Sequence, residues 1–108
     1  MSMSTEDEVR ALETELDRVV DRLNGMPLYR AATATESCYA VAQEILTRTR
    51  SLDGDVPSDA ALPRLEPHGL GSVLAVIGRD YVKAAKAAPL SDVMPVTNRL
   101  IELRRSLP

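Results

Sequence analysis

The sequence predicts an all-α protein, an antiparallel four-helix bundle whose helices alternate up, down, up and down. Three observations support this: apolar residues recur every three or four positions in four stretches, glycine and proline separate those stretches, and none alternates like a strand. With 108 residues the chain has the size of one domain, residues 1–108, and can bury a core without a disulfide or metal.

The first helix is marked at both ends. Thr5 and Glu8 form a capping-box pattern at its start, and Asn24 and Gly25 form a stop at its end. Between them runs a narrow apolar stripe that suits pairing with another helix, either inside the bundle or from a second copy of the chain. We therefore treat the stripe as a candidate interaction surface: Val9, Leu12, Leu16, Val19 and Leu23.

The second helix is expected over residues 27–52. A break near residue 34 stays open, because Thr33 and Glu36 form a second capping box. The residues expected on its inner face are Leu28, Ala31, Thr35, Cys38, Ala42, Ile45 and Leu46. Residues 53–66 contain two prolines and several turn formers, which predicts a long loop between the second and third helices.

The third helix, within residues 67–88, has the densest apolar pattern and is expected to be buried from several sides. Gly78 lies in its middle, where glycine costs about 1 kcal/mol relative to alanine, so another backbone or a bulky side chain should come close there. Ser91 and Asp92 open the last helix. Its stripe is Val93, Val96, Leu100, Leu103 and Leu107, with Arg104 and Arg105 at the negative end of its dipole.

Composition limits the partners. The net charge is −3 and the sequence has no basic stripe, so nucleic acid is not expected. The acidic N-terminus has no apolar segment typical of a signal peptide, and no apolar run is long enough to cross a membrane. Cys38 is the only cysteine, which excludes an internal disulfide and suits a reducing cytoplasm. The many arginines and alanines suggest a GC-rich bacterial genome.

One part of the chain resembles known sequences. The run LGSVLAVIGRDYVKAA at residues 70–85, followed by LIELRRSLP at 100–108, is similar to the C-terminal halves of small uncharacterised helical proteins of actinobacteria. The resemblance is limited to the C-terminal third of the chain and consists of helical apolar spacing with Gly78 and Asp80. It implies an all-helical fold and no known activity, so no functional residue is carried over.

Motifs for metal or nucleophilic chemistry are incomplete. Asp53, Asp55 and Asp59 suggest a calcium loop, but Ser58 and Arg64 stand where the glycine and the bidentate glutamate belong. A di-iron site needs more than one histidine, so no cofactor is expected. His68 as a general base and Cys38 as a nucleophile are the remaining catalytic candidates.

The best-supported hypothesis is a non-enzymatic helical interaction or adaptor module that self-associates. Its first helix also carries an acidic face that would suit a basic partner: Glu13, Glu15, Asp17 and Asp21. The alternative is a small-molecule-binding bundle with a pocket near Gly78, Asp80 and Tyr81, where a charge interrupts an apolar helix. An enzyme that uses His68 or Cys38 ranks third.

Overall fold

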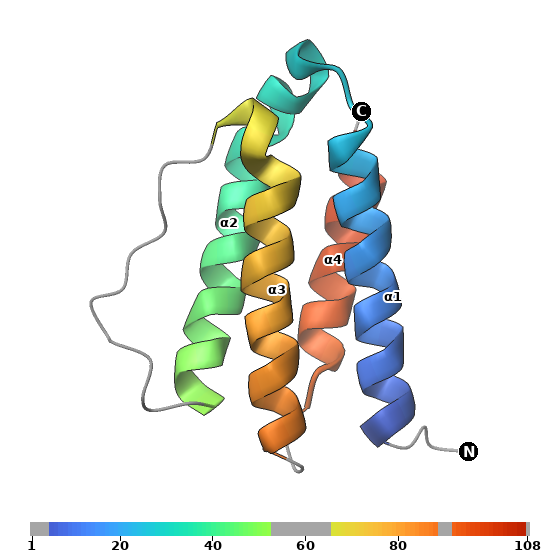
Figure 1. Ribbon diagram of the computed structural model, residues 1–108, viewed down its shortest axis with the longest axis vertical. Coiled ribbons are helices and arrows are strands. Elements are labelled where there is room, and N and C mark those ends of the chain that lie inside the picture. The colour runs from blue at the N-terminus through green and yellow to red at the C-terminus, as the bar shows by residue number, and fades with distance from the viewer. Residues whose placement is uncertain (1–4, 53–65, 89–91, 108) are drawn as a thin grey trace.

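The computed structural model describes residues 5–52, 66–88 and 92–107, and in this part of the chain it is an all-α four-helix bundle (Figure 1). The helices are α1 (Thr5–Asn24), α2 (Leu28–Leu52), α3 (Leu70–Ala87) and α4 (Met94–Ser106). A single 3₁₀ turn, η1 (Pro67–Gly69), leads directly into α3. The predicted fold class is therefore confirmed. The aspartates considered for a calcium loop, Asp53, Asp55 and Asp59, lie outside the described residues.

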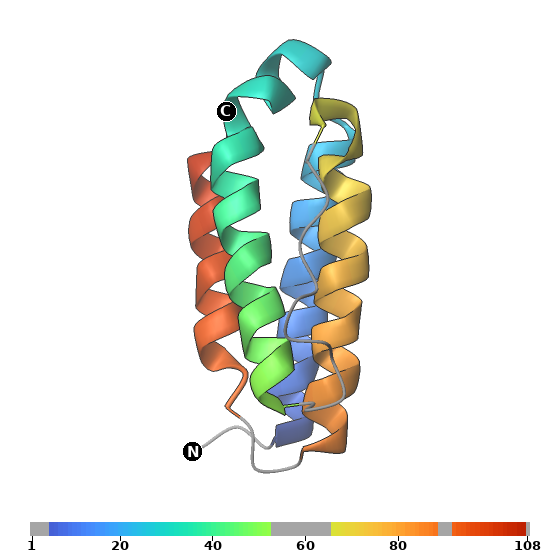
Figure 2. The same cartoon turned by 90° about the vertical axis from the view of Figure 1, so that its left-hand side faces the viewer.

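The predicted alternation of helix directions is wrong for α3. Figures 1 and 2 show α1 and α4 running one way along the bundle and α2 and α3 running the other way. Thr49 and Ala87, near the C-terminal ends of α2 and α3, line the same groove, as expected for parallel neighbours. Residues 53–65 are long enough to permit this, because their extended reach of about 43 Å exceeds the roughly 27 Å length of α3.

The third helix holds the bundle together, as its sequence predicts. It packs against α1 on one side and α2 on the other, whereas α4 packs mainly against α1. At the crossing of α1 and α3, a Cβ atom added to Gly78 would lie 2.6 Å from Cδ1 of Leu16. The predicted close approach at Gly78 is thus confirmed, and Leu16 is the side chain that occupies the space.

The core consists almost entirely of aliphatic side chains from all four helices. Tyr81 is the one aromatic residue buried among the described residues, with 2% of its surface exposed. The largest fully buried aliphatic residues are Leu12, Ile45, Leu70, Leu74, Leu100, Val19, Val93 and Val96. Small and branched side chains of this kind let helices approach closely and pack at high density.

The second helix is continuous but bends near its start (Figures 1 and 2). Two threonine hydroxyls donate to backbone carbonyls one turn earlier: Thr33 to Arg30 at 2.7 Å and Thr35 to Ala31 at 3.3 Å. Such bonds compete with the helical ladder and often bend a helix. The region where a break was considered is therefore helical but bent.

Candidate functional site

The predicted interaction surface on α1 is part of the chain's own core. None of Val9, Leu12, Leu16, Val19 and Leu23 is more than 5% exposed. They pack beneath α3 and α4, the main neighbours of α1. Of the two alternatives, pairing inside the bundle or with a second copy, the structure shows the first: this chain's own helices cover the stripe, so it is not an exposed interaction surface.

The predicted pocket near Gly78, Asp80 and Tyr81 does not form. Gly78 packs against Leu16, Tyr81 is buried in the core and Asp80 is exposed. Successive helical positions point about 100° apart, so Gly78 and Tyr81, nearly one turn apart, share the buried side of α3, whereas Asp80 points away from both toward solvent. Asp80 lines an open groove between α2 and α3 of about 290 Å³, together with Leu46, Thr49, Ile77, Lys83, Ala84 and Ala87.

The two catalytic candidates lie in unsuitable places. Cys38 is only 1% exposed, and burial raises the pKa of its thiol from 9.0 to about 11. The thiol is therefore protonated near neutral pH, whereas nucleophilic chemistry uses the thiolate. His68 is exposed in η1 and makes no hydrogen bond or ion pair within the described residues. Nor do those residues contain a group of three or more His, Cys, Asp or Glu arranged to hold a metal.

We expect Cys38 to be unreactive toward a water-soluble disulfide reagent in the folded protein at pH 8, and to react once urea unfolds it. The thiol pKa is higher in the folded protein than in the unfolded chain, so the native state holds the proton more tightly. Protonated Cys38 therefore stabilises the native state below pH 9, and this contribution is lost as the pH rises toward 11. Unfolding of a Cys38→Ala variant should therefore depend less on pH across this range. Rapid labelling of the native protein would contradict the buried placement.

A partly buried ion pair joins α1 to α4. Glu15 is 4% exposed, and its Oε1 accepts a hydrogen bond from Nε of Arg104. Arg18 approaches the other carboxylate oxygen at 3.5 Å from its own exposed position. Glu15 was expected on an acidic face that would suit a basic partner, which is wrong because its side chain is buried. Its spacing of three residues from Leu12 and four from Val19 places it at the edge of the buried stripe, a signal that the sequence did contain.

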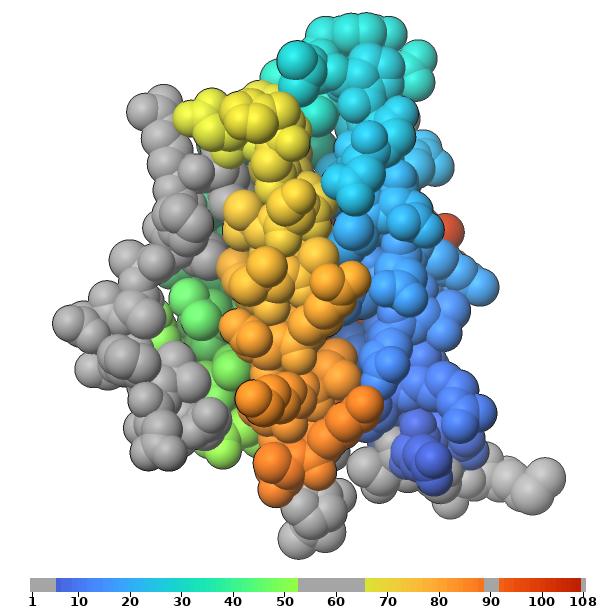
Figure 3. All heavy atoms as spheres, in the orientation of Figure 1, coloured from blue at the N-terminus to red at the C-terminus, as the bar shows by residue number. Residues whose placement is uncertain are grey.

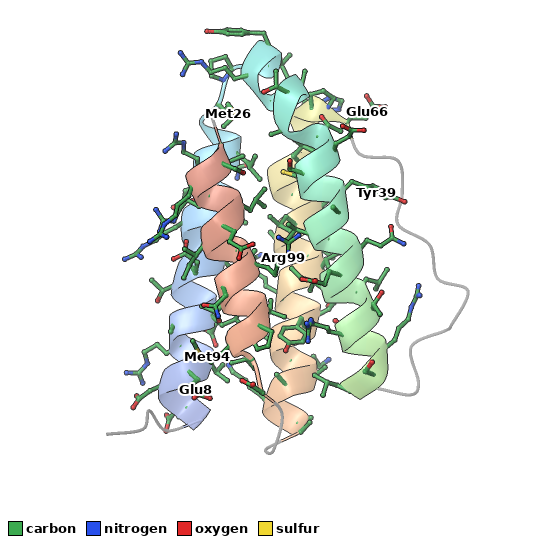
Figure 4. The ribbon with its side chains drawn as sticks, turned by 180° about the vertical axis from the view of Figure 1, so that it is seen from behind. Glu8, Met26, Tyr39, Glu66, Met94 and Arg99 are labelled. Carbon is green, nitrogen blue, oxygen red and sulfur yellow. The ribbon has the colours of Figure 1, made fainter. Side chains whose placement is uncertain are left out.

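Apolar side chains are exposed at the start of α2. Leu28 and Tyr29, which we call the α2 tip, are 61% and 70% exposed. Leu28 was predicted to face inward; it does not, because the first turns of α2 extend beyond the ends of α1 and α3 (Figure 1). Figure 4 shows Met26 at the same end of the bundle. The Arg30 guanidinium lies 5.8 Å from the centre of the Tyr29 ring, within cation–π range.

A second surface feature, the α1/α3 groove, runs between these two helices and has a volume of about 420 Å³. Its lining residues are Glu13, Leu16 and Asp17 from α1 and Arg79, Val82, Lys83 and Lys86 from α3. Figure 3 shows α1 and α3 side by side on this face. The acidic side chains thus lie along one wall and the basic ones along the other, with two aliphatic side chains between them.

Comparison with known proteins assigns no family to the chain. Scans against protein-family models, curated proteins and solved structures find no match. The resemblance to actinobacterial helical proteins stays a prediction. Of the helices described, none combines the length and the hydropathy needed to cross a bilayer.

Proposed function

We propose that the protein is a non-enzymatic helical interaction module, an adaptor that self-associates and docks a protein partner on the α2 tip. One observation carries the proposal: Leu28 and Tyr29 are the two most exposed large hydrophobic side chains of the described residues and are adjacent in sequence. The bundle holds them on a helix that extends past its neighbours (Figure 2).

The chemistry of the α2 tip favours binding. Covering an exposed leucine or similar side chain contributes about 1.5–3 kcal/mol, and tyrosine and arginine are enriched among the residues that dominate binding energy. A tyrosine also has few rotatable bonds, so little entropy is lost when it is fixed. Arg30, beside the Tyr29 ring, supplies a cation at the edge of the same patch. The expected partner surface is a small apolar pocket with an acidic rim.

Partner capture with matched variants tests the proposal. The full chain is immobilised and exposed to extract from the source cells, alongside the variants Leu28→Ser and Tyr29→Ser. We expect a specific partner to be retained by the parent chain and by Tyr39→Ser, and retained at least about tenfold less by the two tip variants. Tyr39→Ser is the control because Tyr39 is also an exposed tyrosine of α2, 42% exposed and away from the tip.

Two results would contradict this assignment. One is a partner that binds the tip variants as well as it binds the parent chain. The other is the absence of any specific partner from the extract when the parent chain is saturating. All variants change exposed residues, so circular dichroism should show the same helix content throughout.

A further inference from the structure

We propose that two copies of this chain pair through the α1/α3 groove, around a two-fold axis parallel to the groove. The inference rests on the self-association in the proposed function and assigns it a surface separate from the α2 tip. The occupant of the groove is a second copy of the chain, and the argument for this is the way its charges are distributed.

In the α1/α3 groove the acidic side chains come from α1 and the basic ones from α3, and only some of them form ion pairs within one chain. Lys86 pairs with Glu13 at 3.1 Å between Nζ and Oε1. Among the described residues, Asp17 of α1 and Arg79 and Lys83 of α3 have no ion-pair partner. One copy therefore presents a free carboxylate on one wall and, on the other, two free cations that lie about one helical turn apart.

Symmetry makes this pattern complementary to itself. A two-fold axis along the groove places α1 of each copy over α3 of the partner, so each acidic wall faces a basic wall. Because the axis is parallel to the helices, residues at the same height meet, and Asp17 faces the partner's Arg79 and Lys83. A two-fold axis across the groove would instead place α1 over α1, with like charges opposed, which is unfavourable.

The face also has the size and some of the apolar surface that association needs. Two adjacent helices, each about 30 Å long and about 10 Å across, offer roughly 600 Å² per copy, near the lower limit for specific interfaces. Val76 is 60% exposed and precedes Arg79 by three residues and Lys83 by seven, so it lies on the same side of α3. Because the apolar content is modest, we expect a reversible dimer that weakens as salt rises.

A charge reversal with its rescue tests the inference. Molar mass is measured by light scattering over a wide dilution range for the parent chain, Asp17→Arg, and Asp17→Arg combined with Lys83→Asp. We expect Asp17→Arg to raise the dimer dissociation constant at least about tenfold, because it opposes like charges twice in the dimer. The combined variant exchanges the two signs and should restore most of the affinity. Glu36→Arg, the same charge change on an exposed site of α2, should leave the constant unchanged.

Each outcome discriminates between the hypotheses. A parent chain that stays monomeric at all concentrations overturns both this inference and self-association, and leaves partner docking on the α2 tip to its own test. A dimer that tolerates Asp17→Arg, or that is not restored by adding Lys83→Asp, overturns only the α1/α3 groove as its interface. A dimer lost in Tyr29→Ser and kept in Asp17→Arg would place self-association at the α2 tip instead.

Discussion

Replacing Arg104 with methionine is expected to lower the free energy of unfolding by about 2–3 kcal/mol. The substitution removes the guanidinium that donates to the buried carboxylate of Glu15, and an unpartnered buried charge is strongly destabilising. Arg18 offsets part of the loss, because its guanidinium stays within 3.5 Å of the other carboxylate oxygen. Urea unfolding followed by circular dichroism measures the effect.

Two further variants identify the cause. Arg105→Met changes the same residue type one position along α4, where the side chain is exposed, and should shift stability by less than about 0.5 kcal/mol. Adding Glu15→Leu to Arg104→Met removes the buried carboxylate that has lost its Arg104 partner and should recover most of the lost stability, since an apolar pair often replaces a buried ion pair without cost. Equal effects of Arg104→Met and Arg105→Met would show that the ion pair does not matter for stability.

Local sequence signals account for most of the fold. The four apolar stripes and the stop and start residues locate the helices within a few positions of their observed ends. Asp92, predicted to open the last helix, lies one residue before the N-cap Val93 and accepts a hydrogen bond from the backbone N–H of Met94 at 3.1 Å. Gly78 indicated a close helix approach because its helical cost needs a compensating contact, and Leu16 provides that contact.

The direction in which α3 runs could not be predicted from these local signals. An apolar stripe has the same period whether its helix runs up or down, so the stripe on α3 was compatible with both directions. The apolar stripe of α1 likewise did not show which helix covers it. The same residues are needed whether the stripe is buried by a second copy of the chain or by α3 and α4.

The α2 tip and the α1/α3 groove also depend on how the helices are arranged in space, which local sequence patterns do not encode. Leu28 fits the inner-face pattern of α2 and becomes exposed only because α2 extends past its neighbours. The α1/α3 groove arises where two stretches far apart in the sequence come together. Asp17 and Lys83 were visible as charges in the sequence, but only the packing of α1 on α3 places them on opposite walls of one groove.

Replacing Gly78 with valine is expected to destabilise the protein by about 2–3 kcal/mol. A Cβ atom alone would lie 2.6 and 2.7 Å from the two methyl carbons of Leu16, closer than real contacts allow, and valine adds two further methyl groups. Overpacking of this kind costs about 1–3 kcal/mol, and the better helix propensity of valine returns only a few tenths. Thermal or urea unfolding measures the loss.

Gly71→Ala is the matched control in the same helix. Its Cβ would meet Oδ1 and Cγ of Asn24, whose exposed side chain can rotate away, and would lie 3.3 Å from the backbone oxygen of Val20, a tight contact but not a clash. Stability should therefore change much less than in Gly78→Val. Adding Leu16→Ala to Gly78→Val frees the crowded space, so the double variant should lose less stability than the two single losses combined. Additive losses would mean that Leu16 does not limit the approach of the helices.

The Gly78→Val variant also links the core to the proposed dimer. Leu16 forms part of the floor of the α1/α3 groove, so crowding at Gly78 pushes the acidic and basic walls apart. The charges on the two walls would then no longer match the spacing of the partner's walls. We therefore expect Gly78→Val to weaken the dimer under conditions where the variant is still folded, whereas Gly71→Ala should leave it intact. A dimer of unchanged affinity in folded Gly78→Val would mean that groove width does not control self-association.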